Sequence, residues 1–323
     1  MLTLNKINQA YKRLKNVSYL TPLIYCKMLS EKYKSNIFLK AESLQISGSF
    51  KYRGAYNKIL QIVEKQQNQE VVAWSSGNHA YAVAMAANKL GIKAHVIMPK
   101  DAPSIKLKNT KSQGALITTF NRETENREAI GIKLAKKYNA VIVPPYDDIQ
   151  IMAGQGTIGI EVINQLKSLQ LEPDLILVPT GGGGLLSGIA TAIKSKIPNV
   201  DIRGVEPEKF NDTALSIQKG YRIFNKNLSA FTICDSLRAP TPGKITFEVN
   251  KNLTGPGLIA KDKEVFKAMR YAYLELKLVL EPGGAIALAS ILNESISISG
   301  KTVIVIASGG NVGPETFSLA IKN

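Results

Sequence analysis

Short apolar runs alternate with helical segments along most of this chain. From Glu70 onward, runs rich in β-branched residues are each followed by a turn and by apolar residues at helical spacing. The runs predict strands at residues 37–42, 71–74, 94–98, 115–120, 140–145, 175–179, 201–207 and 302–308. Helices are expected between them, including a long one over about 149–169. This alternation is typical of parallel strands joined by crossover helices, so the sequence predicts an α/β fold.

The spacing of these elements predicts two α/β units. Residues 70–146 form a smaller unit, inserted into a larger one that is built from residues 1–69 and 147–323. Ligands of parallel sheets bind beyond the carboxyl ends of the strands, where loops lead into helices. We therefore expect the functional residues in loops that follow strands.

Composition and charge limit the classes of function. The 323 residues are 45% hydrophobic and 20% charged, as in globular proteins, and no apolar run is long enough to span a membrane. The net charge of +16 is spread over polar helix faces without a recognised binding motif, so we expect no nucleic-acid or membrane partner. Cys26 and Cys234 lack metal-ligand spacing, and the N-terminus does not resemble a signal peptide, so a cytoplasmic setting is expected.

Four consecutive glycines follow the predicted strand at 175–179 and precede a helix. Such a loop lets backbone N–H groups converge on an anion at a helix N-terminus, which favours a phosphate over a merely flexible turn. A P-loop would need Gly-Lys-Ser/Thr, and Ser187 breaks the dinucleotide-binding spacing. A formal match, GQGTIG at 154–159, does not directly follow a strand. The loop therefore predicts a compact phosphorylated cofactor.

Three other segments carry candidate binding groups. SSGNHA, residues 75–80, opens a helix and could receive a carboxylate, or could be a serine N-cap followed by a buried His79. Glu206 and Asp212 could supply oxygen ligands to a hard cation, or could be solvated. Lys51, in GSFKYRGA, is either an ordinary surface lysine or an amine held for chemistry.

Several of these segments occur together in one known family. The chain carries, in order, GSFKYRGA, SSGNHA, AGQGT, PTGGGGLLSG, GVEP and ASGGN. In this order they resemble the fold-type II pyridoxal-phosphate (PLP) enzymes, and the chain is similar to the serine/threonine dehydratase and serine racemase group from about Thr21 to Gly313. The resemblance implies a two-domain α/β fold like that of the tryptophan synthase β chain, with parallel sheets flanked by helices.

The resemblance also implies roles for individual residues. Lys51 would bind the cofactor aldehyde as a Schiff base and later remove the α-proton of the substrate. Phe50 would pack against the cofactor ring, Asn78 would bond its phenolic oxygen and Ser308 would face its nitrogen. The main-chain amides that hold the phosphate would come from Gly181, Gly182, Gly183, Gly184 and Leu185. The substrate carboxylate would bind the loop formed by Ser75, Ser76, Gly77, Asn78 and His79.

Further positions bear on specificity and on a metal. Serine racemases carry a serine where Ser76 stands, opposite the lysine, so the resemblance implies a second catalytic group there. Glu206, the Phe210 carbonyl and Asp212 match the racemase-like cation site, which implies Mg²⁺ or Ca²⁺.

Arg238 is a candidate for substrate recognition. It lies in DSLRAPTPG, beside Ser236, which replaces a glycine that the family often has. Its guanidinium could meet a second substrate carboxylate, which suggests 3-hydroxyaspartate as a substrate. Alternatively, it could pair with a local acid or with solvent.

Together these features predict a PLP-dependent ammonia-lyase that converts serine, threonine or a related β-hydroxy amino acid to a 2-oxo acid and ammonia, with racemase side activity. A dedicated serine racemase and a 3-hydroxyaspartate ammonia-lyase are the alternatives among enzymes. A phosphate-ligand or nucleic-acid binding protein, in which Lys51 would have no role, is the alternative outside them. The family implies a homodimer. The chain ends soon after SGGN, so no C-terminal regulatory domain and no feedback inhibition by isoleucine are expected.

Overall fold

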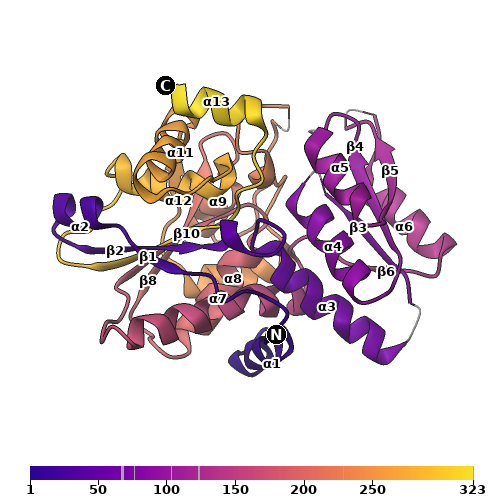
Figure 1. The fold of residues 1–323 in the computed structure, drawn as a ribbon, viewed down its shortest axis with the longest axis horizontal. Helices are drawn as coiled ribbons and strands as arrows, with labels where there is room; N and C mark the ends of the chain where they lie inside the picture. The colour runs from indigo at the N-terminus through magenta and orange to yellow at the C-terminus, as the bar shows by residue number, and fades with distance from the viewer. Residues whose placement is uncertain (67–68, 76, 103, 123, 228, 323) are drawn as a thin grey trace.

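The computed structural model describes residues 1–66, 69–75, 77–102, 104–122, 124–227 and 229–322, and its strands form two sheets (Figure 1). The strands are β1 (Leu23–Tyr25), β2 (Asn36–Ala41), β3 (Val71–Trp74), β4 (Ala94–Pro99), β5 (Leu116–Phe120), β6 (Val141–Ile142), β7 (Leu175–Pro179), β8 (Asp201–Pro207), β9 (Leu258–Ala260) and β10 (Thr302–Ala307). The six-stranded sheet has the order β1-β2-β10-β7-β8-β9, and the four-stranded sheet has the order β5-β4-β3-β6. All paired strands are parallel except β1, which is antiparallel to β2.

Helices follow most of these strands, as the alternation predicted. The helices are α1 (Leu4–Leu14), α2 (Lys27–Tyr33), α3 (Lys51–Lys65), α4 (Asn78–Lys89), α5 (Ser104–Ser112), α6 (Arg127–Lys137), α7 (Ile149–Lys167), α8 (Gly184–Lys194), α9 (Asp212–Lys219), α10 (Lys244–Leu253), α11 (Asp262–Leu276), α12 (Pro282–Leu292) and α13 (Pro314–Lys322), with short 3₁₀ turns η1 (Glu42–Leu44) and η2 (Asp235–Leu237). None of the helices in the described ranges is long and apolar enough to cross a membrane.

The predicted α/β fold is confirmed, with two differences in detail. The expected strand at 140–145 pairs only over Val141 and Ile142, because the two prolines that follow have no N–H to donate. The short edge strands β1 and β9 were not predicted, since three residues are too few for a period-two pattern to appear.

The central strands of the six-stranded sheet are apolar on both faces because helices cover both. Leu175 and Leu177 of β7 face the cluster formed by α11 and α12, whereas Ile176 and Val178 face α7 and α8. Successive side chains of a strand point to opposite faces, so a strand buried on both sides reads as a continuous apolar run. This burial explains why LILVP and TVIVIA were recognisable from the sequence.

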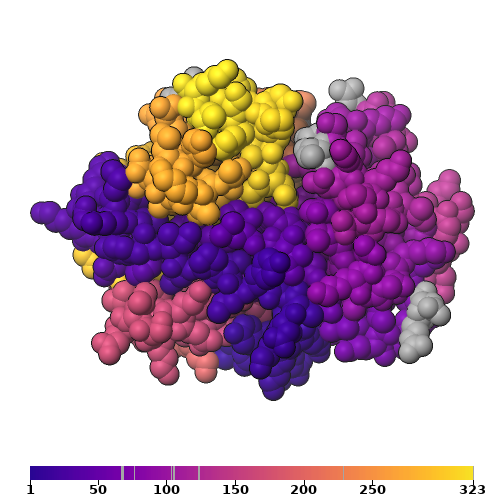
Figure 2. Space-filling view, in the orientation of Figure 1, coloured from indigo at the N-terminus to yellow at the C-terminus, as the bar shows by residue number. Residues whose placement is uncertain are grey.

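Helix α3 lies between the two sheets. Its residues Tyr52, Tyr56 and Ile59 belong to the apolar cluster of the four-stranded unit, together with the alanines of α4. Figure 1 shows α3 running from the six-stranded unit toward the strands β3 to β6. Figure 2 shows the indigo N-terminal segment reaching across the same face to the purple four-stranded unit. Because α3 precedes residue 70 in the chain but packs with the four-stranded unit, the predicted domain boundaries at 69/70 and 146/147 stay a prediction.

The GQGTIG segment lies inside α7, where its glycines serve helix packing. A Cβ on Gly154 would stand 2.6 Å from the carbonyl oxygen of Arg53 in α3, and one on Gly156 would stand 2.7 Å from that of Gly188 in α8. The backbones of three helices therefore meet closely here, which only glycine permits. This segment is a packing site and not a nucleotide-binding loop.

Four charged side chains are buried together beside the start of α3. The Arg53 guanidinium binds the carboxylates of Glu42 and Glu161 at 2.6 to 2.9 Å, and Lys40 Nζ lies 2.6 Å from Glu161. Lys40 Nζ also donates to the Thr21 carbonyl oxygen at 2.7 Å. The group is balanced, with two cations and two carboxylates, and it links β2, α3 and α7.

Candidate active site

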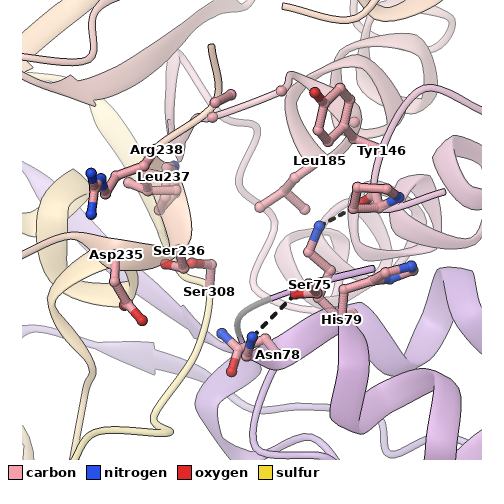
Figure 3. A pocket seen from close by; sticks show the side chains of 18 of the residues that line it. Ser75, Asn78, His79, Tyr146, Leu185, Asp235, Ser236, Leu237, Arg238 and Ser308 are labelled. Atoms are coloured by element: carbon pink, nitrogen blue, oxygen red, sulfur yellow. Dashed lines mark hydrogen bonds between the residues drawn. The ribbon is translucent and has the colours of Figure 1, made fainter. Parts of the chain in front are cut away.

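The ends of three parallel strands and the start of α3 meet around one pocket. The loops after β3, β7 and β10 bring Ser75, Gly181 to Gly184 and Ser308 to its wall, together with Lys51 from α3. Figure 3 shows Asp235 to Arg238 on one side of this pocket and Ser75, Asn78 and His79 on the facing side. The loops that follow these strands therefore line one pocket, and their function stays a prediction.

Most of the predicted site residues line this pocket. They are Phe50, Lys51, Ser75, Gly77, Asn78, His79, Gly181, Gly182, Gly183, Gly184, Leu185, Arg238 and Ser308. Ser76 lies outside the described residues. The predicted cation ligands Glu206, Phe210 and Asp212 are not among the described residues that line the pocket, and they form a separate group.

Lys51 is a desolvated amine at the first position of α3. Its Nζ donates to the Pro145 carbonyl oxygen at 2.7 Å and lies 5.0 Å from the centre of the Phe50 ring. Burial lowers the pKa of Lys51 to about 8, although the nearby Glu281 carboxylate acts in the opposite direction. An amine with such a pKa has a substantial unprotonated fraction near neutral pH and can act as a nucleophile or a base.

The glycine loop is shaped to receive an anion. Gly183 has a φ of +92°, and Gly184 begins α8. The Gly182 carbonyl oxygen accepts from Thr246 Oγ1 at 2.7 Å and that of Gly183 from Asn250 Nδ2 at 3.3 Å, so these carbonyls turn toward α10. A Cβ on Gly182 would stand 2.4 Å from the Tyr146 ring. The tight loop therefore presents a helix N-terminus, which favours a phosphate group.

The loop before α4 presents a second helix N-terminus to the pocket. Gly77 holds the N-cap position of α4, and its N–H donates to Ser75 Oγ at 3.1 Å. His79 is buried, with Nε2 2.9 Å from the Val143 carbonyl oxygen, so this nitrogen carries the proton. Burial, reinforced by Lys51, lowers the pKa of His79 to about 3, so the imidazole is neutral. His79 therefore adds no positive charge to this loop.

Glu281 is a pocket residue that sequence reasoning missed. It is the N-cap residue of α12, is buried, and accepts a hydrogen bond from Asn78 Nδ2. Burial raises the pKa of Glu281 to about 7, against the opposing influence of Lys106. Asn78 Oδ1 in turn accepts from Asn311 Nδ2 at 2.9 Å. A lone acid between the apolar run LVL, residues 278–280, and the apolar segment PGGAIALASIL was the available signal.

Other charged side chains of the pocket carried no recognisable signal in the sequence. Lys106, Arg122, Arg127 and Asp235 come from segments that have ordinary polar patterns. Tyr146 also lines the pocket, directly after the two prolines that end β6. Lys106 and Asp235 form an ion pair of 2.7 Å across the pocket. Cations outnumber carboxylates in this lining, so the pocket favours anionic ligands.

Arg238 and Ser308, two of the predicted site residues, both line the pocket. The Arg238 guanidinium lies 5.3 Å from the centre of the Phe210 ring, and burial followed by the charge of Arg122 lowers its pKa. Ser308 is buried, and its hydroxyl donates to the Gly283 carbonyl oxygen at 3.4 Å. The neighbouring Ser236 also lines the pocket.

Glu206 and Asp212 lie close together around the start of α9. The Glu206 carboxylate accepts from the backbone N–H groups of Thr213 at 3.0 Å and Ala214 at 2.6 Å, so it caps α9. The buried Asp212 carboxylate has no hydrogen-bond partner among the described residues for either oxygen. Burial raises the pKa of Asp212 to about 7. Burial, together with the negative charge of Asp212, also raises the pKa of Glu206. No group of three or more His, Cys, Asp or Glu side chains in the described part of the chain is arranged as a metal site.

Comparison with known proteins places this pocket in a family context. The family model described as pyridoxal-phosphate dependent enzyme matches residues 15–309. An L-threonine ammonia-lyase of Thermotoga maritima is 38% identical over 97% of this chain and 76% of its own length. An L-threo-3-hydroxyaspartate ammonia-lyase of Saccharomyces cerevisiae is 37% identical over 99% of this chain and 96% of its own length.

A solved structure has a similar fold over nearly the whole chain. Maize serine racemase superposes with a TM-score of 0.92 at 34% identity, covering 99% of this chain and 97% of the racemase. With its two helix N-termini, its desolvated lysine and a family match over most of its length, this chain belongs to the pyridoxal-phosphate dependent enzymes.

Proposed function

We propose that this chain is a PLP-dependent ammonia-lyase that converts L-threonine, L-serine or a related β-hydroxy amino acid to a 2-oxo acid and ammonia. The observation that carries the proposal is the Lys51 amine, desolvated to a pKa of about 8 in a pocket that also contains the glycine loop. The similarity to ammonia-lyases over nearly the whole chain supports the same reaction class.

The residues of the pocket fit the cofactor. Gly181 to Leu185 and the N-terminus of α8 would hold its phosphate, and Phe50 would pack against its ring. Asn78 and Ser308 line the same pocket, and we propose that they bond the phenolic oxygen and face the pyridine nitrogen, respectively. When bound, PLP supplies an aldehyde for a covalent link to Lys51 and withdraws electrons from the substrate α-carbon.

The protein's own groups would then bind the substrate and move protons. The Ser75 to His79 loop would receive the substrate carboxylate, with Ser76 as the proposed second catalytic group. Lys51 Nζ would remove the proton from the α-carbon, and the β-hydroxyl would leave as water. This elimination leaves a carbon–carbon double bond between the α- and β-carbons. The released enamine tautomerises to an imine, and hydrolysis of the imine gives the 2-oxo acid and ammonia.

The first experiment compares the wild type with Lys51→Ala. The wild type, supplied with PLP and L-threonine, should form 2-oxobutanoate, and the variant should lose activity by about 10³-fold or more. Borohydride reduction followed by peptide mass spectrometry should find the cofactor attached at residue 51. A wild type that takes up no cofactor, or a variant that keeps its activity, would contradict the proposal.

Two alternative activities are kept because specific observations support them. The likeness to maize serine racemase supports racemisation as a main or side activity, and measuring D-serine against pyruvate from L-serine separates the two. The presence of Arg122, Arg127 and Arg238 in the pocket lining supports 3-hydroxyaspartate as a substrate. If Arg238→Ala leaves the 3-hydroxyaspartate rate unchanged relative to that with serine, Arg238 does not recognise the second carboxylate.

We also propose that Glu206, Asp212 and the Phe210 carbonyl hold a Mg²⁺ or Ca²⁺ ion with a structural role. The support is Asp212, a buried carboxylate whose two oxygens lack hydrogen-bond partners among the described residues. Added Ca²⁺ should raise the melting temperature of the wild type and EDTA should lower it. Asp212→Asn should lose this response, whereas Glu208→Gln, an exposed acid nearby, should keep it. An unchanged response in Asp212→Asn would refute the site.

We also propose that the chain forms a homodimer and acts in the cytoplasm. Tyr19, Leu20, Tyr25 and Met28 are large apolar side chains with about half or more of their surface exposed near the edge strand β1, which supports a subunit contact. The two buried cysteines are unpaired, which fits a reducing compartment. Light scattering of the purified protein would give the oligomeric state directly.

A further inference from the structure

Lys106 is a buried cation that connects the two sides of the pocket. It belongs to α5 of the four-stranded unit, and its side chain is only 8% exposed. Its Nζ lies 2.7 Å from Asp235 Oδ2 in η2 and 3.8 Å from Glu281 Oε2 at the start of α12. Asp235 and Glu281 both belong to the larger unit, whereas α5 belongs to the four-stranded unit, so the ammonium group links the two units.

The same ammonium group lies against the loop that would receive the substrate. A Cβ built on Gly77 would stand 3.0 Å from Lys106 Nζ and 2.9 Å from its Cδ. Gly77 is the N-cap residue of α4, where the helix end already favours a negative charge. Any side chain at position 77 would displace Lys106, so this glycine keeps the lysine in contact with the loop.

The described residues of the loop contribute no full positive charge. His79 is neutral, and Ser75 and Asn78 are uncharged donors. Lys106, in contrast, is protonated, because Glu281 and Asp235 together outweigh the effect of burial and raise its pKa. A buried ammonium beside uncharged donors would discriminate between a carboxylate and a neutral group of the same shape, since a charge-assisted hydrogen bond is stronger than a neutral one.

We propose that Lys106 recognises the α-carboxylate of the amino-acid substrate, as a specificity-determining residue. The inference rests on the proposed function, because it takes the Ser75 to His79 loop as the carboxylate site. Lys106 would make the site selective for free amino acids over their amides or esters. The competing role is that of a mechanical tether between the units, which would affect all ligands alike.

The test uses unreactive ligands so that binding is measured apart from turnover. L-Alanine lacks a β-hydroxyl to eliminate, and L-alaninamide carries a neutral amide of nearly the same shape in place of the carboxylate. Their affinities for the PLP-loaded enzyme can be measured by calorimetry and by the change in the visible spectrum of the cofactor. The wild type should bind L-alanine more tightly than L-alaninamide.

Lys106→Gln should weaken L-alanine binding by about 10- to 100-fold, the value of one charge-assisted hydrogen bond, and change L-alaninamide binding by less than about threefold. Lys106→Arg, which keeps the charge, should restore part of the L-alanine affinity. Lys108→Gln is the matched control, because Lys108 is exposed on the same helix, and it should bind both ligands as the wild type does.

Asp235→Asn separates recognition from tethering. It breaks the ion pair but leaves the Lys106 charge in place, so L-alanine affinity should stay within about threefold of the wild type or increase. If Lys106→Gln weakens both ligands equally, or if Asp235→Asn loses as much L-alanine affinity as Lys106→Gln, the proposal is wrong and the residue is a tether. Failure of the wild type to take up PLP would instead contradict the proposed function, so the two failures are distinguishable.

Discussion

Lys51 and Arg53 stand two residues apart in the first turn of α3, but their side chains lie in opposite electrostatic surroundings. Arg53 is held by two carboxylates within 2.9 Å, in a buried group whose charges balance. Lys51 has one carbonyl oxygen as its hydrogen-bond partner among the described residues and a lowered pKa of about 8. Glu42 and Arg53 bind each other, so the pKa of Glu42 is lowered and that of Arg53 is raised.

This difference in pairing distinguishes residues that stabilise the fold from residues that are suited to chemistry. A buried charge that is fully paired keeps its ordinary ionised form and fixes the backbone around it. A buried group that is left with few partners changes its proton affinity, and such groups gather at functional sites. Lys51, His79 and Glu281 are of the second kind, with pKa values of about 8, 3 and 7. The paired group anchors α3 in place, and the desolvated amine at its start faces the pocket.

The largest effect is expected from breaking the paired group. Arg53→Met should lower the free energy of unfolding by about 3–5 kcal/mol, because it leaves Glu42 and Glu161 buried with insufficient positive charge. Urea denaturation measures the change. Lys58→Met is a matched control on the same helix, where the pair with Asp148 is partly exposed, and it should cost about 1 kcal/mol or less. Equal losses in the two variants would remove the distinction.

Substitution of Lys51 in the cofactor-free protein should raise the free energy of unfolding, whereas substitution of Arg53 lowers it. Lys51→Met replaces a desolvated amine by an apolar group of similar shape, so it should raise the free energy of unfolding at pH 7 by about 2 kcal/mol. The Lys51 pKa is lowered on folding from 10.5 to about 8, so the unfolded chain binds more protons between these values and wild-type stability rises with pH across that window.

The difference in the free energy of unfolding between the Lys51→Met variant and the wild type should therefore decrease as the pH rises from the folded-state pKa of about 8 toward the unfolded value of 10.5. Denaturation of both proteins at several pH values in this range tests the sign. A variant that is less stable than the wild type at pH 7 would show that Lys51, like Arg53, is part of the scaffold.

The smallest effect is expected where an ion pair is exposed. Lys27 and Glu31 pair at 3.9 Å, with side chains that are 77% and 65% exposed. Lys27→Ala should change the free energy of unfolding by less than about 0.5 kcal/mol, because water solvates both partners. A larger change would mean that pairing alone, without burial, accounts for the contribution of Arg53.

Much of the fold and part of the site could be predicted because they depend on local pattern. The buried central strands give continuous apolar runs, and the glycine loop before α8 has a backbone conformation, with φ of +92° at Gly183, that glycine favours. Edge strands β1 and β9 escaped prediction because they are short and partly exposed. The GQGTIG match needed its context, since a glycine that lets helices approach looks the same in sequence as one that contacts a phosphate.

The sequence by itself determined the α/β alternation, the glycine loop and the lysine of α3, because each is written in residues that are adjacent or regularly spaced. Only the tertiary structure decided which charges meet. Lys106 and Asp235 are 129 positions apart, and Asn78 and Glu281 are 203 apart, yet both pairs form hydrogen bonds across the pocket. The proton affinity of a buried group depends on distances of a few ångströms to such partners, and the folded chain alone sets those distances.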